Sequence, residues 1–366
     1  MLNATTPIHI AIIGAGIAGL SCATAIRQAS VIVSSAPDTN PNLTVSVFEK
    51  SRGAAGRMST RRGDGWQCDH GAQYFTANNP EFRAEVARWE EAGVAGIWKP
   101  ILKSLPGGSL PLPNVELSPA WFVGTPRMTS PAQWLATSQT IHTVTTIQEL
   151  QPENVSDAGK FPARRWLLKS AELGLLEQYF DAVVLAIPAP QTLPLLGEFA
   201  PGLTQIARHA KIRSCWTLMM RVSENVSNPF DFDAAFVNRG PLGWIARDGS
   251  KLGREQSVAG QQTWVLHATP EWSDANLEQN ADHVAATLIN AYVELGGAPP
   301  QSWTAHRWRY STIKPDEKPN MTSNFAWDDD ARIGLCGDWL AGGNVEAAWL
   351  SGQRLAARIL SAQQLA

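Results

Sequence analysis

The sequence contains few cysteines and no paired cysteine motif. Its four cysteines, Cys22, Cys68, Cys215 and Cys336, show neither a C-x-x-C pair nor the spacing of metal ligands. Scattered cysteines in apolar surroundings are typically buried, reduced thiols. The pattern therefore argues against a disulfide framework, and we predict no metal site.

Long runs of one charge are also missing. The 30 basic and 33 acidic side chains leave a formal net charge of −3. Nucleic acid and anionic membranes are therefore not expected partners. No cationic leader precedes an apolar run at the N-terminus, so we expect no signal peptide and a cytoplasmic protein. The charge-free stretch 10–26 contains three spaced glycines, which favour a strand, a turn and a buried helix over a membrane span.

Tryptophan, in contrast, is abundant. The chain of 366 residues has 15 tryptophans, several of them in strand-like segments. They could line a cavity for a flat aromatic ligand or simply fill a core, and the sequence leaves both open. The length fits two closely joined domains.

A glycine-rich turn follows the first apolar strand. The β-branched run Ile8–Ile13 predicts a strand buried on both faces, as in parallel sheets. Gly14, Gly16 and Gly19 then give the G-x-G-x-x-G spacing. The first glycine makes the turn, the second admits a pyrophosphate, and the third lets helix and strand pack closely. With the N-terminus of a helix predicted over 17–28 facing the phosphates, the motif indicates a bound dinucleotide.

A carboxylate ends the second predicted strand. Glu49 closes the run LTVSVFE, where an acid would accept hydrogen bonds from an adenosine ribose. The spacing from the glycines is longer than usual. We interpret Ser34–Asn42, rich in Pro, Asn and Ser, as a surface loop that accounts for the extra length.

A second glycine loop lies near the C-terminus. The strand RIGLC leads into Gly337-Asp338, the loop Ala341–Asn344 and a helix with apolar residues at helical spacing. The buried run within Phe180–Pro190 predicts a further strand. Together with the first unit, these segments predict one discontinuous dinucleotide-binding domain.

Arg57 distinguishes between possible dinucleotides. The sequence from Glu49 to Arg57 resembles the flavoprotein amine oxidase superfamily, where an E-x-x-x-x-x-G-G-R pattern brings an arginine to the FAD phosphates. Here the glycine pair is Ala55-Gly56, and because alanine favours negative φ we expect the loop to differ locally. In that superfamily, the segment matching 68–77 runs beside the flavin, the Gly-Asp pair binds the ribityl or phosphate end, and the last helix points its N-terminus at the pyrimidine end. The implied FAD ligands are Gly14, Gly16, Ile17, Ala18, Gly19, Glu49, Lys50, Gly56, Arg57, Met58, Gly71, Ala72, Gln73, Ala186, Gly337, Asp338, Asn344 and Val345.

Five segments narrow the resemblance to the bacterial renalase-like flavoproteins. They are FEKSRGAAGRMSTRR, CDHGAQYFTA, WVLHATPEWS, HRWRYS and GDWLAGGNVEAAWLSG. The resemblance implies an α/β fold: a Rossmann-type FAD-binding domain of the p-hydroxybenzoate hydroxylase and amine oxidase type, with a mixed-sheet α+β substrate domain and non-covalent FAD. The expected FAD-binding domain comprises 1–80, 138–190 and 325–366, and the expected substrate domain 81–137 and 191–324.

The intervening chain has patterns of its own. Amphipathic periodicity predicts helices over Glu81–Gly93 and Leu277–Gly297. Alternating segments within Cys215–Pro270 predict antiparallel strands, and Ser302–Ser311 predicts a last strand of this domain.

The family resemblance also implies an activity. Off-pathway dihydronicotinamide isomers would be oxidised to NAD(P)+, with dioxygen as electron acceptor and hydrogen peroxide as product. Such chemistry needs a flat ring held close to the flavin rather than a nucleophile or a metal. The candidate contacts are Trp308, Tyr74, Trp244, His267 and Asn238. For each of them a purely structural role is the alternative.

Three other functions stay open. An amine oxidase with the same flavin is less expected, because such enzymes often flank the flavin with two tyrosines, whereas the C-terminal segment here carries Trp339 and Trp349. A flavin-binding protein without catalysis is the second possibility, and an NAD-dependent dehydrogenase is the third, disfavoured by Arg57 and the second glycine loop. The sequence indicates neither the oligomeric state nor the exact substrate.

Overall fold

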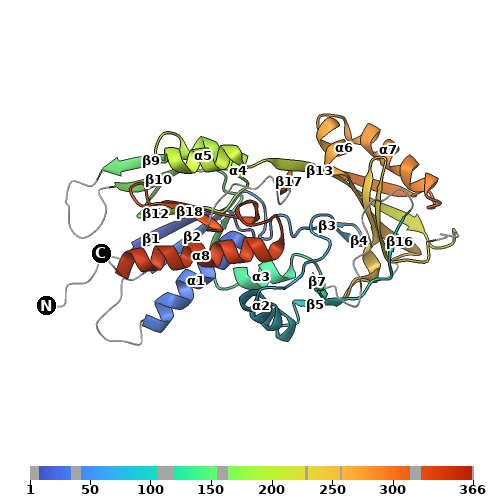
Figure 1. Ribbon diagram of the computed structural model, residues 1–366, viewed down its shortest axis with the longest axis horizontal. Coiled ribbons are helices and arrows are strands. Elements are labelled where there is room, and N and C mark those ends of the chain that lie inside the picture. The colour runs from blue at the N-terminus through green and yellow to red at the C-terminus, as the bar shows by residue number, and fades with distance from the viewer. Residues whose placement is uncertain are drawn as a thin grey trace. The chain divides into compact units, whose positions relative to one another are not determined.

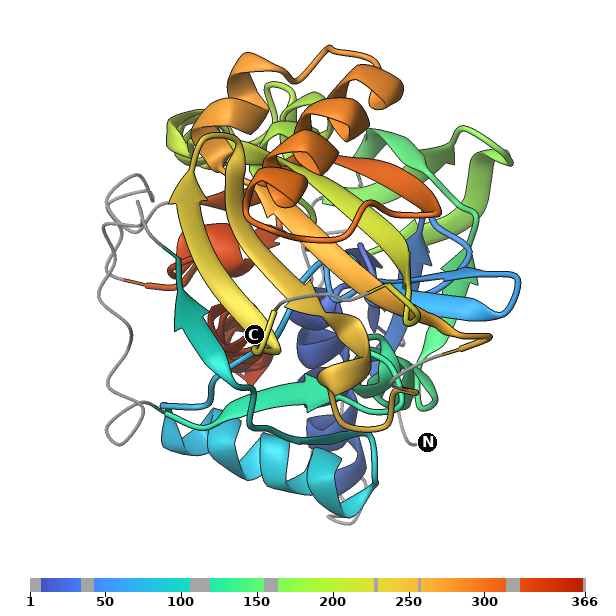
Figure 2. The same cartoon turned by 90° about the vertical axis from the view of Figure 1, so that its right-hand side faces the viewer.

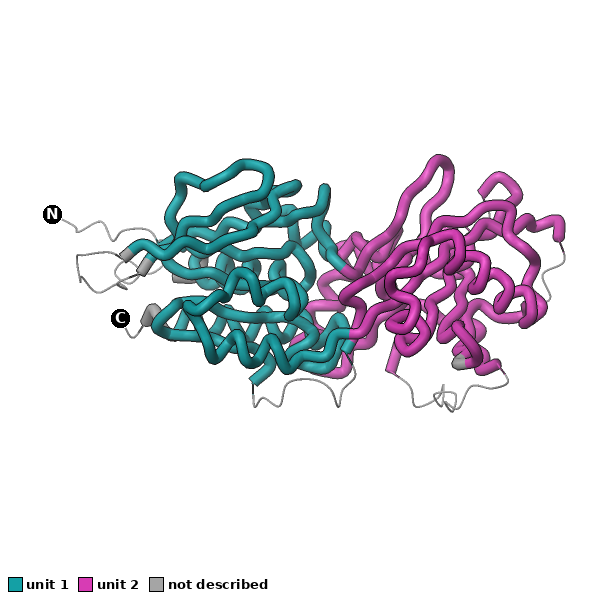
Figure 3. Tube along the Cα trace, turned by 90° about the horizontal axis from the view of Figure 1, so that it is seen from above, with its two compact units in different colours: residues 1–56, 132–212, 313–366 teal, residues 57–131, 213–312 magenta. Residues whose placement is uncertain are grey.

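The computed structural model describes residues 8–33, 43–105, 119–154, 164–226, 230–255, 258–313 and 323–364. The predicted insertion Ser34–Asn42 lies outside them. The chain forms two compact units, shown in teal and magenta in Figure 3. Unit 1 comprises residues 1–56, 132–212 and 313–366, and unit 2 comprises residues 57–131 and 213–312. The assignment of one domain to FAD and the other to substrate stays a prediction, and its proposed boundaries differ mainly at 57–80 and 191–212.

Unit 1 is built on a six-stranded sheet. Its strands, in spatial order, are β18 (Phe325–Asp328), β19 (Ile333–Cys336), β12 (Ala182–Leu185), β1 (Ile8–Ile13), β2 (Leu43–Glu49) and β8 (Thr140–Thr143). All neighbours are parallel except β18, which pairs antiparallel with β19. The carboxyl ends of parallel strands share one edge of a sheet, so the residues that follow β1, β2, β12 and β19 meet there.

Helices and a smaller sheet cover the two faces of this sheet (Figure 1). On one face, α1 (Ile17–Val33) lies beside α8 (Val345–Gln364), and the predicted first helix thus extends past residue 28. A Cβ at Gly352 of α8 would lie 2.2 Å from the carbonyl oxygen of Ala18 in α1, which shows how closely the two helices approach.

The opposite face carries the rest of the unit 1 core. Ala11 and Ile13 of β1 pack there with Trp166 and Phe180. The covering elements are the antiparallel strands β9 (Ile147–Asn154), β10 (Arg164–Ser170) and β11 (Gly174–Phe180), and the helices α4 (Ala189–Leu196) and α5 (Pro201–His209). The short helix α3 (Ser130–Ala136) precedes β8.

Unit 2 holds a second six-stranded sheet. Its order is β17 (Ser302–Ile313), β13 (Ile212–Ser223), β16 (Gln261–Ala268), β15 (Leu242–Arg247), β14 (Ala234–Arg239) and β6 (Leu102–Ser104). The pairs β13–β16, β15–β16 and β14–β15 are antiparallel, which confirms the prediction for this region. Strand β6 pairs parallel with β14.

Two helices accompany this sheet, α6 (Pro270–Ala275) and α7 (Ala281–Glu294), drawn in orange in Figure 2. Side chains of α7, among them Leu288 and Tyr292, pack on Leu218 and Leu266 in the core of unit 2. The helix begins later than predicted because Asn280 caps it, its Oδ1 accepting a hydrogen bond from the backbone N–H of His283.

The remaining elements of unit 2 are short. The helix predicted over 81–93 is confirmed as α2 (Pro80–Glu91), capped by Asn79. Two antiparallel pairs complete the unit, β3 (Thr60–Gly63) with β4 (Trp66–Asp69), and β5 (Ala95–Trp98) with β7 (Trp121–Gly124).

Candidate functional site

The three glycines after β1 meet different surroundings. Gly14 has φ +108°, and a Cβ there would lie 2.5 Å from the carbonyl oxygen of Ala186. At Gly19 a Cβ would lie 2.0 Å from the carbonyl oxygen of Gly14. At Gly16, however, a Cβ would meet no atom within 4 Å. Gly14 and Gly19 are therefore required by packing. Gly16 leaves open space at the N-terminus of α1, as the binding of a pyrophosphate requires.

Glu49 stands at the end of β2, beside this turn. Its Oε2 accepts a hydrogen bond from the N–H of Ala15 at 2.9 Å, and its Oε1 accepts one from the N–H of Ser51 at 2.8 Å. Each carboxylate oxygen can accept a second bond, so Glu49 can still bind ribose hydroxyls. Lys50, next in the chain, is exposed.

The loop after β2 folds back over the glycine turn. The N–H of Ala55 donates to the carbonyl of Ala15 at 3.0 Å, and a Cβ at Gly56 would lie 3.4 Å from the Cα of Gly16. The expectation that alanine at position 55 would keep a negative φ is wrong, since Ala55 has φ +129°. The hydrogen bond to Ala15 holds Ala55 in a backbone conformation that normally favours glycine.

The C-terminal glycine loop follows β19 at the same edge of the sheet. The backbone carbonyl of Asp338 accepts hydrogen bonds from the N–H groups of Ala341, Gly342 and Gly343, each at 2.9 Å. Gly342 and Gly343 have positive φ, which lets the chain reverse tightly before α8.

Asn344 caps α8. Its Oδ1 accepts a hydrogen bond from the N–H of Ala347 at 2.7 Å, so α8 begins at Val345 with its N-terminus on the loop. Trp339 is buried and donates its indole N–H to the carbonyl of Ile187 at 3.2 Å. Trp349 is buried as well.

Unit 1 thus gathers most of the predicted dinucleotide ligands at one edge. Those that follow β1, β2, β12 or β19 are Gly14, Gly16, Ile17, Ala18, Gly19, Glu49, Lys50, Gly56, Ala186, Gly337, Asp338, Asn344 and Val345. The open space at Gly16, the free lone pairs of Glu49 and the N-termini of two helices fit a dinucleotide there.

The other predicted FAD ligands belong to unit 2, where glycine permits a close backbone contact. A Cβ at Gly71 would lie 1.9 Å from the carbonyl oxygen of Arg57, which also accepts the N–H of Ala72 at 2.9 Å. The guanidinium of Arg57 donates to the carbonyl of Ser311 at 3.0 Å. Met58 is buried.

One face of the unit 2 sheet presents a row of candidate side chains. Trp244 on β15 stands opposite His267 on β16, and His267 stands opposite Thr217 on β13. Phe236 on β14 faces Trp244 from the other side. Leu266, next to His267 on β16, packs in the core that also contains the side chains of α7. Because successive side chains of a strand point to opposite faces of the sheet, the row lies on the other face.

Residues 70–74, called the 70–74 segment below, touch this row at several points. The indole N–H of Trp308 donates to the carbonyl of His70 at 3.0 Å, and their rings stack with centroids 5.1 Å apart. Gln73 Nε2 lies 3.4 Å from His267 Nε2. The ring centroid of Tyr74 lies 6.0 Å from that of Trp244. Four of the five predicted substrate contacts are therefore connected through this segment, whereas the side chain of Asn238 lies outside what the structure describes.

Tyr74 and Trp244 belong to a larger aromatic cluster that the sequence did not single out. Trp121 stacks on Tyr74 with centroids 3.8 Å apart and planes 5° apart. Trp98 and Phe236 pack against the same group. Burial raises the pKa of Tyr74, so its phenol stays neutral. This cluster forms an apolar aromatic surface at one end of the row.

The histidines near the row are held neutral. Burial, with the neighbouring His306 second, lowers the pKa of His70 from 6.5 to about 3. Burial and then the charge of Lys251 lower the pKa of His267 from 6.5 to about 4. Both imidazoles are therefore uncharged at neutral pH.

A buried ion cluster supports the 70–74 segment from behind. Lys251 Nζ lies 2.9 Å from Asp248 Oδ1 and 3.3 Å from Asp69 Oδ2, and Arg254 pairs with Asp69. Asp69 and Lys251 have fully buried side chains. Burial alone would raise the pKa of Asp69, but Lys251 and Arg254 hold it below its ordinary value.

The pKa values of Asp248 and Lys251 shift for different reasons. Burial raises the pKa of Asp248. Burial would lower the pKa of Lys251, but Asp248 and Asp69 outweigh it and raise the pKa. The sequence did not predict this cluster. Asp248, Lys251 and Arg254 follow one another at three-residue spacing, but Asp69 comes from a distant segment, and no sequence pattern connects it to them.

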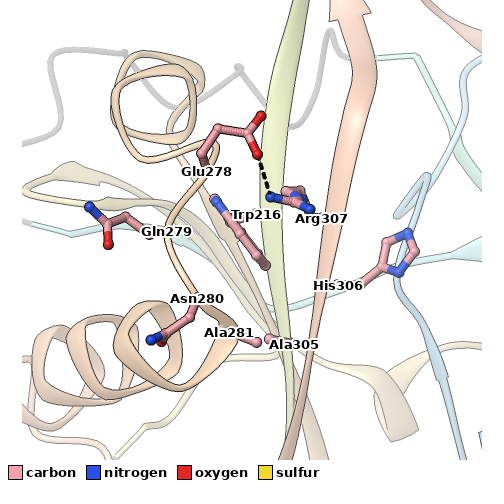
Figure 4. A pocket seen from close by; sticks show the side chains of 8 residues that line it. All are labelled: Trp216, Glu278, Gln279, Asn280, Ala281, Ala305, His306 and Arg307. Atoms are coloured by element: carbon pink, nitrogen blue, oxygen red, sulfur yellow. Dashed lines mark hydrogen bonds and ion pairs between the residues drawn. The ribbon is translucent and has the colours of Figure 1, made fainter.

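An open pocket lies elsewhere on unit 2 (Figure 4). It has a volume of about 510 Å³. Arg307 donates to Glu278 at 3.1 Å, and its guanidinium carbon lies 5.5 Å from the ring centroid of Trp216. His306 lines the edge of the pocket and points away from that group in the figure. None of the predicted site residues lines it.

All four cysteines are free and buried. Burial raises the pKa of Cys22 to about 12 and that of Cys215 to about 11. The structure thus confirms the prediction of buried thiols outside disulfides. Within the described ranges, no helix combines the length and apolar character needed to cross a membrane, and no group of His, Cys, Asp and Glu could hold a metal ion.

Comparisons with known proteins agree with this architecture. Residues 12–89 match the family model described as an NAD(P)-binding Rossmann-like domain. Renalase from Mus musculus is 25% identical over 322 residues, which cover 83% of this chain and 85% of that protein.

Solved structures share the fold along nearly the whole chain. A candidate protoporphyrinogen oxidase from Exiguobacterium sp. 255-15 superposes with a TM-score of 0.69 at 14% identity, covering 98% of this chain and 100% of that one. Putrescine oxidase bound to putrescine gives a TM-score of 0.65 at 13% identity, covering 97% and 99%. These likenesses confirm the predicted fold, a Rossmann-type domain within the amine oxidase architecture.

Proposed function

Because this chain is a renalase-like flavoprotein, an oxidoreductase whose cofactor is FAD, we propose that it oxidises isomeric dihydronicotinamide dinucleotides. In the proposed reaction, one dihydronicotinamide, one dioxygen and one proton give one oxidised NAD(P)+ and one hydrogen peroxide. When bound, FAD supplies the hydride acceptor and returns the electrons to dioxygen. The cytoplasmic location and the use of dioxygen are part of this proposal.

In this proposal, the chain's own residues bind and orient. The edge of the unit 1 sheet binds the dinucleotide through the open turn at Gly16, the carboxylate of Glu49 and the N-terminus of α8. Arg57 adds a fixed positive charge for a phosphate. The proposal includes non-covalent FAD, and the burial of all four thiols argues against attachment through cysteine.

The proposal for the substrate rests chiefly on the 70–74 segment and its row of aromatic and imidazole side chains. A flat dihydropyridine needs flat apolar walls, which Trp308, Tyr74 and Trp244 can provide. Loss of a hydride leaves a positive charge on the nicotinamide ring. The neutral state of His70 and His267 avoids repulsion of that charge.

The test is anaerobic mixing of the FAD-loaded protein with one compound at a time. The compounds are dihydronicotinamide isomers, ordinary NADH and a panel of small amines, and the flavin absorbance is followed. We expect rapid bleaching by the isomers alone. Bleaching by an amine and not by the isomers would identify an amine oxidase, and no bleaching by any compound would favour a flavin-binding protein without this activity.

Trp308 offers a site-directed version of the same test. Trp308→Leu removes an aromatic wall and is expected to lower kcat/KM for the isomers roughly tenfold, or about 1.4 kcal/mol of transition-state stabilisation. Trp303 lies on the same strand and is 37% exposed, which makes Trp303→Leu the matched control with unchanged kinetics. Equal kinetics in the two variants would remove Trp308 from the site.

A further inference from the structure

Lys251 has no hydrogen atom left for a ligand. Its ammonium group carries three N–H donors, and three acceptors surround it: Asp248 Oδ1 at 2.9 Å, Gln73 Oε1 at 3.2 Å and Asp69 Oδ2 at 3.3 Å. The side chain is fully buried. Lys251 therefore acts on its neighbours in the fold rather than on a substrate.

The first such neighbour is the amide of Gln73. Because Lys251 can only donate, it must face the amide oxygen, and the amide nitrogen must point the other way. That nitrogen donates to the carbonyls of Asp69 at 2.7 Å and Gly71 at 3.1 Å. The contacts of the amide oxygen and those of the amide nitrogen therefore agree on how the Gln73 amide is oriented. In this orientation it is the nitrogen that lies 3.4 Å from His267 Nε2.

This orientation determines the state of His267. The two N–H groups of the Gln73 amide have three acceptors, so the one that points to the carbonyl of Gly71 is shared with His267 Nε2. Because an amide nitrogen cannot accept a hydrogen bond, this contact favours an unprotonated Nε2 on His267. A neutral imidazole then carries its proton on Nδ1. The backbone of His70 opposes burial and Lys251 and raises the pKa of His267. The charged and titratable groups around His267 are Lys251 and His70, with Asp69, Asp248 and Arg254 behind Lys251.

We propose that Gln73 is a positioning residue: oriented by Lys251, it fixes His267 as the neutral Nδ1–H tautomer and thereby holds the backbone of the 70–74 segment in one conformation. The carbonyls of Asp69 and Gly71 accept from Gln73, and the carbonyl of His70 accepts from Trp308 at 3.0 Å. These carbonyls are therefore occupied within the fold. The proposal rests on the proposed function only where it places this segment beside FAD.

The direct measurement is nitrogen-15 NMR of the histidine rings in the FAD-loaded protein, with the His267 signals assigned from His267→Gln. In the wild type we expect a proton on Nδ1, none on Nε2, and no protonation of His267 between pH 8 and pH 5. A proton on Nε2, or titration near pH 6.5, would overturn the proposal. This NMR measurement is made on the wild-type protein and needs no variant of Gln73.

Gln73→Glu tests the role of the amide. A carboxylate still accepts from Lys251 but cannot donate to His267, and it would attract a proton to Nε2. The midpoint of His267 titration is expected to rise by at least two pH units. Gln205→Glu, an exposed residue on α5, makes the same charge change and is expected to leave His267 unchanged. The same midpoint in wild type and Gln73→Glu would refute the proposal.

The contact with FAD has its own readout. We expect Gln73→Glu to alter the visible circular dichroism of bound FAD and Gln205→Glu to leave it unchanged. An unaltered spectrum combined with the shifted titration would contradict the placement of the segment beside the flavin, but not the role of Gln73. Failure of the substrate panel, in turn, would leave both NMR results standing.

Discussion

At the scale of single residues, neighbouring glycines of one turn have separable roles. Gly19 is required by packing, since its Cβ would lie 2.0 Å from a backbone oxygen. Gly16 faces open space and has no such constraint. The fold requires glycine at position 19, whereas only the ligand requires glycine at position 16.

Gly16→Ala and Gly19→Ala should therefore fail in different ways. Gly16→Ala is expected to leave the thermal midpoint of the FAD-free protein within about 2 °C of wild type while weakening FAD binding by about tenfold or more, because the added methyl group occupies the phosphate position. Gly19→Ala is expected to lower the free energy of unfolding of the FAD-free protein itself by about 1–3 kcal/mol.

Thermal melts of the FAD-free proteins and titration with FAD provide both measurements. A normal FAD affinity in Gly16→Ala would show that the pyrophosphate does not lie at this turn. A normal melt in Gly19→Ala would show that the turn can relax around a methyl group.

At the scale of elements, the close approach of α1 and α8 joins the two ends of the chain. Besides the contact at Gly352, Ser21 Oγ donates to the carbonyl of Trp349 at 2.7 Å. Gln353 Nε2 donates to the carbonyl of Ser21 at 3.1 Å. The helix that presents its N-terminus to the C-terminal glycine loop is thus positioned by the first helix.

Gly352→Ala is expected to destabilise this pair of helices. Alanine favours a helix interior by about 1 kcal/mol over glycine, but a Cβ 2.2 Å from the carbonyl oxygen of Ala18 forces the helices apart, at a cost of about 1–3 kcal/mol. Gly202 in α5 is the matched control, because a Cβ there meets nothing within 4 Å. Urea unfolding should show a loss for Gly352→Ala and a gain of up to about 1 kcal/mol for Gly202→Ala. A higher free energy of unfolding in both variants would mean that α8 can move away from α1 without a loss of stability.

At the scale of the whole molecule, buried neutral histidines make stability depend on pH. His70 and His267 have pKa values of about 3 and about 4 in the folded protein, against 6.5 for an ordinary histidine. Below pH 6.5 the unfolded chain takes up protons that the folded protein does not bind. Stability is therefore complete above pH 6.5 and is lost as the pH falls toward 4, by about 1.4 kcal/mol per pH unit for each such histidine.

Urea unfolding between pH 7.5 and pH 5 tests this expectation. The free energy of unfolding should fall with pH in the wild type and fall less steeply, by one proton, in His70→Gln. His283→Gln, at an exposed histidine of α7, should keep the wild-type slope. Parallel slopes for wild type and His70→Gln would show that His70 binds its proton equally well in the folded and the unfolded protein.

The sequence predicted those features that depend on local constraints. The turn after β1 could be predicted because a dinucleotide needs glycine at fixed positions within a few residues of a strand. The conformation of Ala55 could not, because its positive φ is imposed by a hydrogen bond to Ala15 across the fold. The cluster around Lys251 could not be predicted for the same reason: Asp248 is three residues away in sequence, but only tertiary structure brings Asp69 to this pair.

The four buried thiols have a practical consequence. Cys22 and Cys336 lie in unit 1, and Cys68 and Cys215 lie in unit 2. An alkylating reagent can modify such a thiol only during moments when its surroundings open. The rate of modification at each cysteine, followed by mass spectrometry, would therefore measure how often each unit opens. Because each unit contains two such cysteines, no cysteine has to be introduced for this measurement.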